Sequence, residues 1–181
     1  GVSVTTNGRR LPLMFVGRGQ INAQLPFDVQ GSTTLRITSP GGSVEVPVTI
    51  SEPAPAIFST TAQLGERPAV IHTTGALVSD SNPARPGEVV SVFLTGLGRP
   101  EGDIAAGQPA PSVPLLSARG PIEAQIGAIS VTPGFAGLAP GFAGLYQVNL
   151  RLPANLLNGT HAFRIVARGI SSNTVNLVVR Q

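Results

Sequence analysis

The chain has 181 residues, among them 12 Arg and no Lys, nine acidic residues and no Cys, and its formal net charge is +3. The lack of Cys excludes disulfide bonds and thiolate metal sites, and a hydrophobic fraction of 41% excludes a disordered tail. Scattered Arg residues and an aromatic fraction of 4% argue against a nucleic-acid interface, and no apolar stretch approaches the ~20 residues that cross a membrane.

The predicted elements are all β-strands. Polar and apolar residues alternate with a period of two, as in residues 146–152, where Tyr146, Val148 and Leu150 share one face. In chain order, strands are expected at residues 2–6, 11–16, 21–25, 32–38, 44–50, 69–72, 88–95, 122–126, 146–152, 160–167 and 174–180. Short strands separated by Gly and Pro turns predict an all-β protein with a sandwich architecture.

An internal repeat divides the chain. The stretch 20–26 (QINAQLP) returns as residues 147–153 (QVNLRLP), and the triplet 35–37 returns as residues 163–165. Further matches pair Gly31 with Gly159, Gly41 with Gly169, Val46 with Val175, Val48 with Leu177, Ile50 with Val179, and Asn7-Gly8 with Ile126-Gly127. The repeat predicts two tandem immunoglobulin-like modules, at residues 1–52 and 69–181, joined by a stiff Pro-rich linker at residues 53–68.

The two copies are unequal. The second module contains a turn at residues 82–88 and then an apolar strand at residues 89–95, whereas the first module has no counterpart to either. The first module is therefore expected to lack its initial strands, with about five strands against about seven in the second. A missing strand leaves buried backbone groups unpaired, which costs ~1–3 kcal/mol each, and such an edge pairs with any extended chain.

Two interpretations of the N-terminal residues Val2, Ser3, Val4, Thr5 and Thr6 remain open. These residues alternate, contain no Pro and begin the chain, so they are candidates for a strand that is donated to a neighbouring copy. Alternatively, they pair within their own module, matching residues 123–125 of the repeat, and another segment must close the gap.

Several motifs carry a resemblance to a known family. They are the segment 82–98 with its NPARPGEVV and TGLG, the segment 135–149 (FAGLAPGFAGLYQVN), residues 19–22 and residues 171–173. With these motifs, over nearly its whole length, the chain resembles the Solibacter-type uncharacterised C-terminal domain of bacterial secreted proteins. The resemblance implies export and immunoglobulin-like modules, and it implies no activity, cofactor or catalytic residue.

No catalytic or metal-binding constellation is expected. The two histidines, His72 and His161, lack nucleophile partners, and there is no Gly-x-Ser-x-Gly motif. Two distant histidines without Cys do not make a zinc site, and Asp80, Glu101 and Asp103 do not supply the dense oxygen ligands of a calcium loop. We expect no cofactor, no metal and no enzymatic activity.

Two Phe residues lie in a Gly-rich near-tandem repeat at residues 134–145. This stretch lacks the Lys-Ser/Thr ending of a phosphate-binding loop. It is interpreted as a connection in which Phe135 and Phe142 anchor the chain in apolar surface, or alternatively as a loop whose Phe side chains face a neighbouring subunit. The Asn158-Gly159-Thr160 sequon is interpreted as an ordinary turn.

The function predicted from these observations is structural. The charged fraction of 12% suits a protein that covers its surface with copies of itself, so the chain is expected to be a secreted, extracellular or cell-surface subunit of a fibril or pilus-like homopolymer joined by strand donation. The alternative is an accessory or adhesive binding module of a larger bacterial cell-surface protein. Contact with carbohydrate has little support, because the chain has no Trp and one Tyr.

Overall fold

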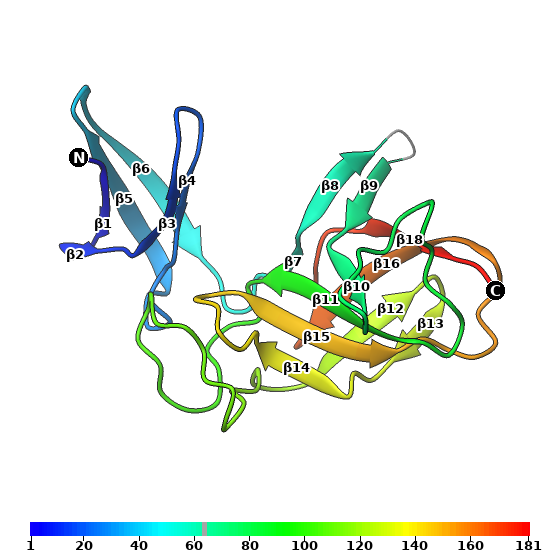
Figure 1. Ribbon diagram of the computed structural model, residues 1–181. Coiled ribbons are helices and arrows are strands. Elements are labelled where there is room, and N and C mark those ends of the chain that lie inside the picture. Colours follow the sequence, from blue (N-terminus) through cyan, green and yellow to red (C-terminus); the bar gives the residue numbers. More distant parts are fainter. Residues whose placement is uncertain (63–64) are drawn as a thin grey trace.

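The computed structural model describes the backbone of residues 1–62 and 65–181 and the side chains of residues 1–59 and 67–181. These residues form antiparallel β-sheets and no helix (Figure 1), which confirms the all-β prediction. Among the described residues there is accordingly no helix that could cross a membrane. We call residues 1–52 the N-terminal unit and residues 53–181 the C-terminal unit.

The N-terminal unit consists of a four-stranded sheet and a separate hairpin at one end of the molecule (Figure 1). The sheet has the order β2-β1-β5-β6, with β1 (Ser3–Thr6), β2 (Arg9–Arg10), β5 (Gly31–Ser39) and β6 (Gly42–Ile50). The hairpin joins β3 (Leu13–Val16) to β4 (Ile21–Ala23). Its tight turn is closed by a hydrogen bond from the Gly17 N–H to the Gln20 carbonyl (2.8 Å).

The C-terminal unit contains two larger sheets. One has the order β10-β11-β15-β14, with β10 (Val70–His72), β11 (Val89–Thr95), β15 (Tyr146–Arg151) and β14 (Phe135–Leu138), and β7 (Ala56–Ile57) also pairs with β11. The other contains β12 (Ile122–Ile126), β13 (Ile129–Val131), β16 (Gly159–Ala167), β17 (Ile170–Ser171) and β18 (Val175–Val179). The hairpin of β8 (Ser59–Ala62) and β9 (Gly65–Pro68) projects beside these sheets (Figure 1).

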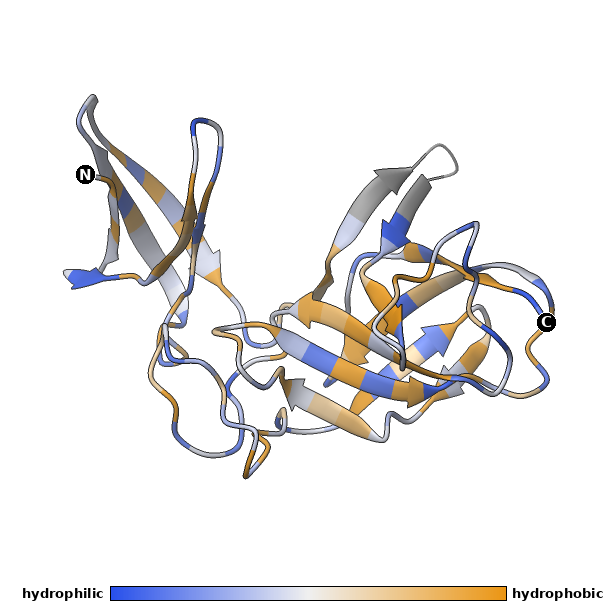
Figure 2. Cartoon of the chain, viewed as in Figure 1, coloured by the Kyte–Doolittle hydropathy of each residue, from blue (hydrophilic) through white to orange (hydrophobic). Residues whose placement is uncertain are grey.

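The main hydrophobic core draws on both sheets of the C-terminal unit. Alternate residues of β11, β15, β12, β16 and β18 belong to one buried cluster, and Figure 2 shows the alternation along β15. Val92, Val148 and Ile165 are each fully buried in that cluster. Because successive side chains of a strand point to opposite faces, this period-two pattern places one apolar face of each sheet in the core.

The two units repeat each other in strand order and in register. The order β2-β1-β5-β6 corresponds to β13-β12-β16-β18, and the pair β3-β4 corresponds to β14-β15. Cross-strand partners also correspond: Leu35↔Val46 with Phe163↔Val175, Val4↔Ile37 with Ala124↔Ile165, and Phe15↔Asn22 with Phe135↔Asn149. The internal repeat of the sequence is therefore a repeat of the structure.

Several details differ from the sequence-based expectations. Part of the expected linker forms β7 and β8–β9, so this segment belongs to the C-terminal unit, where β7 pairs with β11. The segment 135–138, interpreted as a connection, is the strand β14. The N-terminal unit has six strands, because β2 was not anticipated. The match of Asn7-Gly8 is one residue out of register, since Thr6 pairs with Leu35 where Ile126 pairs with Phe163.

Candidate binding groove beside an unpaired strand edge

One edge of β4 has no strand partner among the described residues, whereas the equivalent edge of β15 pairs with β11. The carbonyl of Gln20 and the N–H of Gln24 bond to the β3 side, at 2.8 Å and 3.0 Å. Because backbone groups alternate in direction along a strand, the N–H and C=O groups of Ile21 and Ala23 face the opposite, open edge. Residues 21 and 23 thus present an unused antiparallel pairing edge.

Core positions of the N-terminal unit are also uncovered. Val46 is 39% exposed, whereas its equivalent Val175 is 1% exposed. Ala23 is exposed, whereas the matching Leu150 is 1% exposed. Six further apolar residues in or next to the two N-terminal sheets are only half-buried: Ile21, Leu25, Leu35, Ile37, Val48 and Ile50. The N-terminal unit therefore lacks the strands that cover the equivalent core residues in the C-terminal unit.

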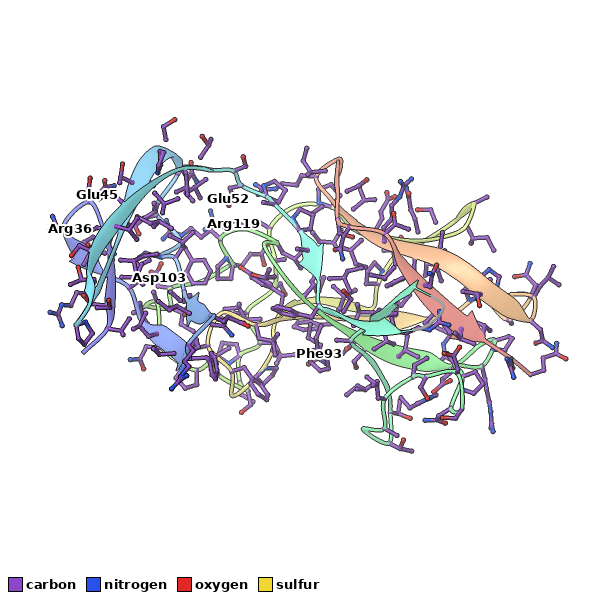
Figure 3. All side chains as sticks on the ribbon, turned by 90° about the horizontal axis from the view of Figure 1, so that it is seen from above. Arg36, Glu45, Glu52, Phe93, Asp103 and Arg119 are labelled. Carbon is purple, nitrogen blue, oxygen red and sulfur yellow. The ribbon has the colours of Figure 1, made fainter. Side chains whose placement is uncertain are left out.

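The outer edge of β6 is protected against further pairing. Pro47 lies in the middle of this strand opposite Thr34, and it has no N–H to donate to an additional strand. Beside it, the exposed Glu45 pairs with Arg36 at 3.6 Å, and Figure 3 shows this pair on the outer part of the unit, away from Glu52. Proline and charge are the usual means of blocking edges, and residues 20–25 of the β4 edge contain neither.

A cleft of about 700 Å³ lies along the open edge of β4, between the two units. This volume is within the range of ~300–1,000 Å³ that is typical of ligand sites. One wall comes from the N-terminal unit: Met14, Gln20, Ile21, Asn22, Ala23, Gln24, Leu25, Pro26, Phe27, Val29, Thr49, Ile50, Ser51 and Glu52. The other wall comes from the C-terminal unit: Ala54, Phe58, Thr95, Gly96, Gly98, Arg99, Ala143, Gly144, Leu145 and Tyr146.

Glu52 fixes the junction at the base of this cleft. Its carboxylate accepts the backbone N–H of Arg99 at 2.8 Å, faces the Arg168 guanidinium at 3.4 Å and also accepts the side chain of Gln30. The hydrogen bond from Arg99 and the positive charge of Arg168 lower the pKa of Glu52 below its ordinary value, against the opposing effect of burial. The carboxylate is thus held charged between the two units.

Two further contacts fix the C-terminal unit's side of the junction. The Ala54 N–H donates to the Gly96 carbonyl at 2.8 Å, and Gly96 has φ of 79°, a conformation that favours Gly. The buried hydroxyl of Tyr146 donates to the Gly98 carbonyl. Burial, and secondarily the charge of Glu52, raise the pKa of Tyr146 far above its ordinary value, so this hydroxyl stays protonated.

The same side-chain hydrogen bond occurs on β4 and β15. The amide of Gln20 donates to the Asn22 side chain at 2.6 Å, and the amide of Gln147 donates to the Asn149 side chain at 2.7 Å. In the C-terminal unit, Asn149 also accepts the hydroxyl of Ser91, its cross-strand partner on β11, at 2.8 Å. Among the described residues, no strand pairs with the open edge of β4 to supply such a hydroxyl to Asn22.

The structure places the predicted assembly residues apart from the cleft. Ser3–Thr6 form β1, which pairs with β5 in its own sheet, with Val4 and Thr6 buried. This arrangement is the second of the two interpretations drawn from the sequence, and it does not leave the segment free. Phe135 is half-buried in β14, whereas Phe142 is 58% exposed and so does not anchor its loop within this chain.

The histidines take part in local structure. His72 contacts the Glu88 carboxylate with Nδ1 at 2.5 Å and the Asn82 carbonyl with Nε2 at 3.2 Å, and His161 contacts the Leu157 carbonyl at 2.8 Å. In the described part of the chain, no three His, Cys, Asp or Glu residues gather as a metal site would require. These contacts involve no nucleophilic side chain.

Comparisons with known proteins identify no family. No family model matches the chain, and no curated protein matches it. Among solved structures, it is similar to Bacteroides ovatus SGBP-B of a mixed-linkage glucan utilization locus, solved in complex with a mixed-linkage heptasaccharide. The identity is 13%, the TM-score is 0.37, and the match covers 99% of this chain and 37% of that structure. A likeness of this size carries no argument about ligand or mechanism.

Proposed function

We propose that this chain is a non-catalytic binding module of an extracellular or cell-surface protein, and that the cleft beside β4 is its binding site. The main observation in support is that the unpaired edge of Ile21 and Ala23 lies along the cleft. The equivalent edge of β15 is paired with β11. The two units are taken to be immunoglobulin-like modules, of which the first lacks its initial strands. The sequence resemblance to domains of secreted bacterial proteins supports the location.

The chemistry of the cleft favours binding over catalysis. Its lining is mostly apolar and small, with a few polar groups that hold fixed positions, which is typical of recognition sites. Its charged side chains are Glu52 and Arg99, and the Glu52 carboxylate is already committed to the junction. A partner in the cleft would cover the apolar wall and pair with the open strand edge.

Arrays of immobilised oligosaccharides and of nine-residue peptides test the proposed function. The wild-type chain should bind at least one array, and Thr95→Trp should reduce that signal, because Thr95 lines the cleft from the side opposite β4. Leu157→Trp is the matched control, since Leu157 is 77% exposed and does not line the cleft. Equal signals from all three proteins on both arrays would refute the cleft as a binding site.

A homopolymer subunit is the second candidate. It is favoured by one observation: the triplet at residues 2–4, which overlaps β1, repeats the triplet at residues 90–92 of β11, the strand whose counterpart the N-terminal unit lacks. A copy would have to release β1 from β5 in order to donate it. Negative-stain microscopy separates the candidates: filaments that vanish when residues 1–6 are deleted support the homopolymer, and monodisperse particles support the binding module.

A further inference from the structure

We infer that the cleft holds an extended polypeptide segment that runs antiparallel to β4, carries a Ser or Thr opposite Asn22, and has apolar residues on both sides of that hydroxyl. This inference rests on the proposed function, because it names the ligand of the same cleft. The inference comes from the C-terminal unit, where β11 pairs with β15, the strand equivalent to β4.

In that example, β11 occupies the open side of β15. The paired residues are Val90↔Leu150, Ser91↔Asn149 and Val92↔Val148. Val90 and Val92 point into the core, with exposures of 1% and 0%, while Ser91 lies on the other face and donates to Asn149. Because β4 and β15 share register, the equivalent ligand residues would lie opposite Ala23, Asn22 and Ile21.

The backbone dictates which ligand groups pair with β4. In β11, Phe93 bonds away from β15: its N–H donates to the Ala69 carbonyl and its carbonyl accepts the Phe58 N–H. Since backbone groups alternate, the N–H and C=O of residues 90, 92 and 94 point toward β15. A ligand of this kind would use the residues equivalent to Val90 and Val92 to reach Ala23 and Ile21, and β-strand addition of this type is an established recognition mode.

Charge favours an uncharged segment. Residues 20–25 of the receiving edge carry no charge, and the Glu52 carboxylate is satisfied by Arg99 and Arg168. The guanidinium of Arg99, the other charged side chain of the cleft, pairs with Asp103 at 3.2 Å. A charged ligand side chain would therefore be desolvated against Ile21 and Ile50 beside charges that already have partners. The strand that fills the equivalent place in the C-terminal unit, residues 89–95 (VVSVFLT), is likewise uncharged.

The ligand is assigned to a different polypeptide because a folded copy keeps both of its Val-Ser-Val segments paired. This triplet occurs twice in the sequence, at residues 2–4, which overlap β1, and at residues 90–92 in β11. β1 lies between β2 and β5, and β11 lies between β15 and the strands β7 and β10. A folded copy therefore has no Val-Ser-Val strand free to donate.

A peptide with the sequence of residues 89–96 is the probe, titrated into the isotope-labelled full chain. The expected result is saturable binding with shifted amide resonances at Ile21 and Ala23. A peptide that is N-methylated at the positions of Val90 and Val92 should bind at least about tenfold more weakly, because the two donors that face Ala23 and Ile21 are lost. N-methylation at the positions of Ser91 and Phe93 should leave binding within about twofold, and equal losses from both patterns would overturn the inference.

Two substitutions in the chain test the receiving edge. Ala23→Pro removes the N–H that faces the ligand and should abolish peptide binding, whereas Ala23→Thr keeps that N–H and should bind within about threefold of wild type. Binding that survives Ala23→Pro in a folded variant overturns the pairing. If Ala23→Pro does not fold, the two methylated peptides still decide the question on the wild-type chain.

The hydroxyl is tested by a double-mutant cycle. Replacing the peptide's Ser by Ala should weaken binding by about fivefold, Asn22→Ala should do the same, and the two changes together should cost little more than either alone. If the two reductions in affinity multiply in the double variant, the hydroxyl and Asn22 act independently, and the proposed contact between them is overturned.

The remaining outcomes separate this inference from the proposed function. Binding of an oligosaccharide that Thr95→Trp reduces, without any peptide binding, would overturn the inference and leave the binding module standing. Self-association of the chain that Ala23→Pro abolishes would make a second copy the occupant and overturn the assignment to a different polypeptide.

Discussion

Asn22 on β4 accepts the same side-chain hydrogen bond from a Gln two residues earlier as Asn149 on β15, at 2.6 Å and 2.7 Å. Among the described residues, only Asn149 has a strand on both sides, and Ser91 of the second strand adds a third member to the group. One chain therefore contains both a completed and an uncompleted version of the same site. Residues around β15 therefore serve as matched controls for the equivalent residues around β4.

The uncovered core predicts unequal costs for the same substitution in the two units. Val175→Thr should lower the free energy of unfolding by about 1–3 kcal/mol, because it buries a hydroxyl at a position that is 1% exposed. Val46→Thr should cost less than about 0.5 kcal/mol, since Val46 is 39% exposed. Urea denaturation of both variants measures the difference, and equal costs would show that the N-terminal unit is already closed.

The close approach of the Ala54 backbone to Gly96 predicts that Gly96→Ala strongly lowers the free energy of unfolding. A Cβ at this position would lie 1.8 Å from the Ala54 carbonyl oxygen, and φ is 79°. Backbone must move to relieve that overlap, so the free energy of unfolding should fall by more than about 2 kcal/mol. Gly41→Ala is the control, because the nearest atom to its Cβ is the Ser39 hydroxyl at 3.7 Å. Similar stabilities of the two variants would contradict the close approach.

The charge on Glu52 predicts a pH-dependent contribution to stability. Its folded pKa is lowered from an ordinary value of 4.5, so the contribution is present above pH 4.5 and is lost as the pH falls through the lower folded pKa. Glu52→Gln should therefore lower the free energy of unfolding at pH 7, and its difference from the wild-type value should become smaller on acidification below pH 4.5. Glu45→Gln, at an exposed ion pair, should change stability by less than about 0.5 kcal/mol. A difference in the free energy of unfolding between Glu52→Gln and wild type that stays constant with pH would contradict a lowered pKa of Glu52.

Arg67 attaches the β8–β9 hairpin to the rest of the C-terminal unit. This Arg is 6% exposed, donates two hydrogen bonds to Asp80 at 2.7 Å and 3.3 Å, and reaches the Asn176 carbonyl at 3.4 Å. Lys cannot reproduce the two-pronged pairing, so Arg67→Lys should cost about 1–2 kcal/mol in thermal or urea unfolding. Arg180→Lys, at an exposed position, should be neutral. Equal behaviour of the two would show that the pairing geometry does not matter.

Period-two alternation and the internal repeat account for most of what the sequence predicts about the fold. Strands such as β12 and β15 were placed to within a residue, because their buried and exposed positions alternate without interruption. β14 was missed because Gly137 interrupts its pattern. The structure supplies the reason for that Gly: a Cβ there would lie 2.3 Å from the Leu116 carbonyl.

The site was predicted only in outline. The unequal repeat indicates a missing strand, and the open edge of β4 is where that strand would pair. The sequence could not decide between the two pairings of residues 2–6, since an alternating terminal segment fits either sheet. The role of Asn22 was also missed, although the Gln-x-Asn spacing occurs both at residues 20–22 and at residues 147–149.

Amide hydrogen exchange of the isolated chain measures the open edge most directly. The account predicts that the amides of Ile21 and Ala23 exchange at about the rate of unstructured chain, while those of the equivalent Val148 and Leu150 are strongly protected by β11. Strong protection of Ile21 and Ala23 in a monodisperse, ligand-free sample would mean that the edge is already covered, and would contradict the account.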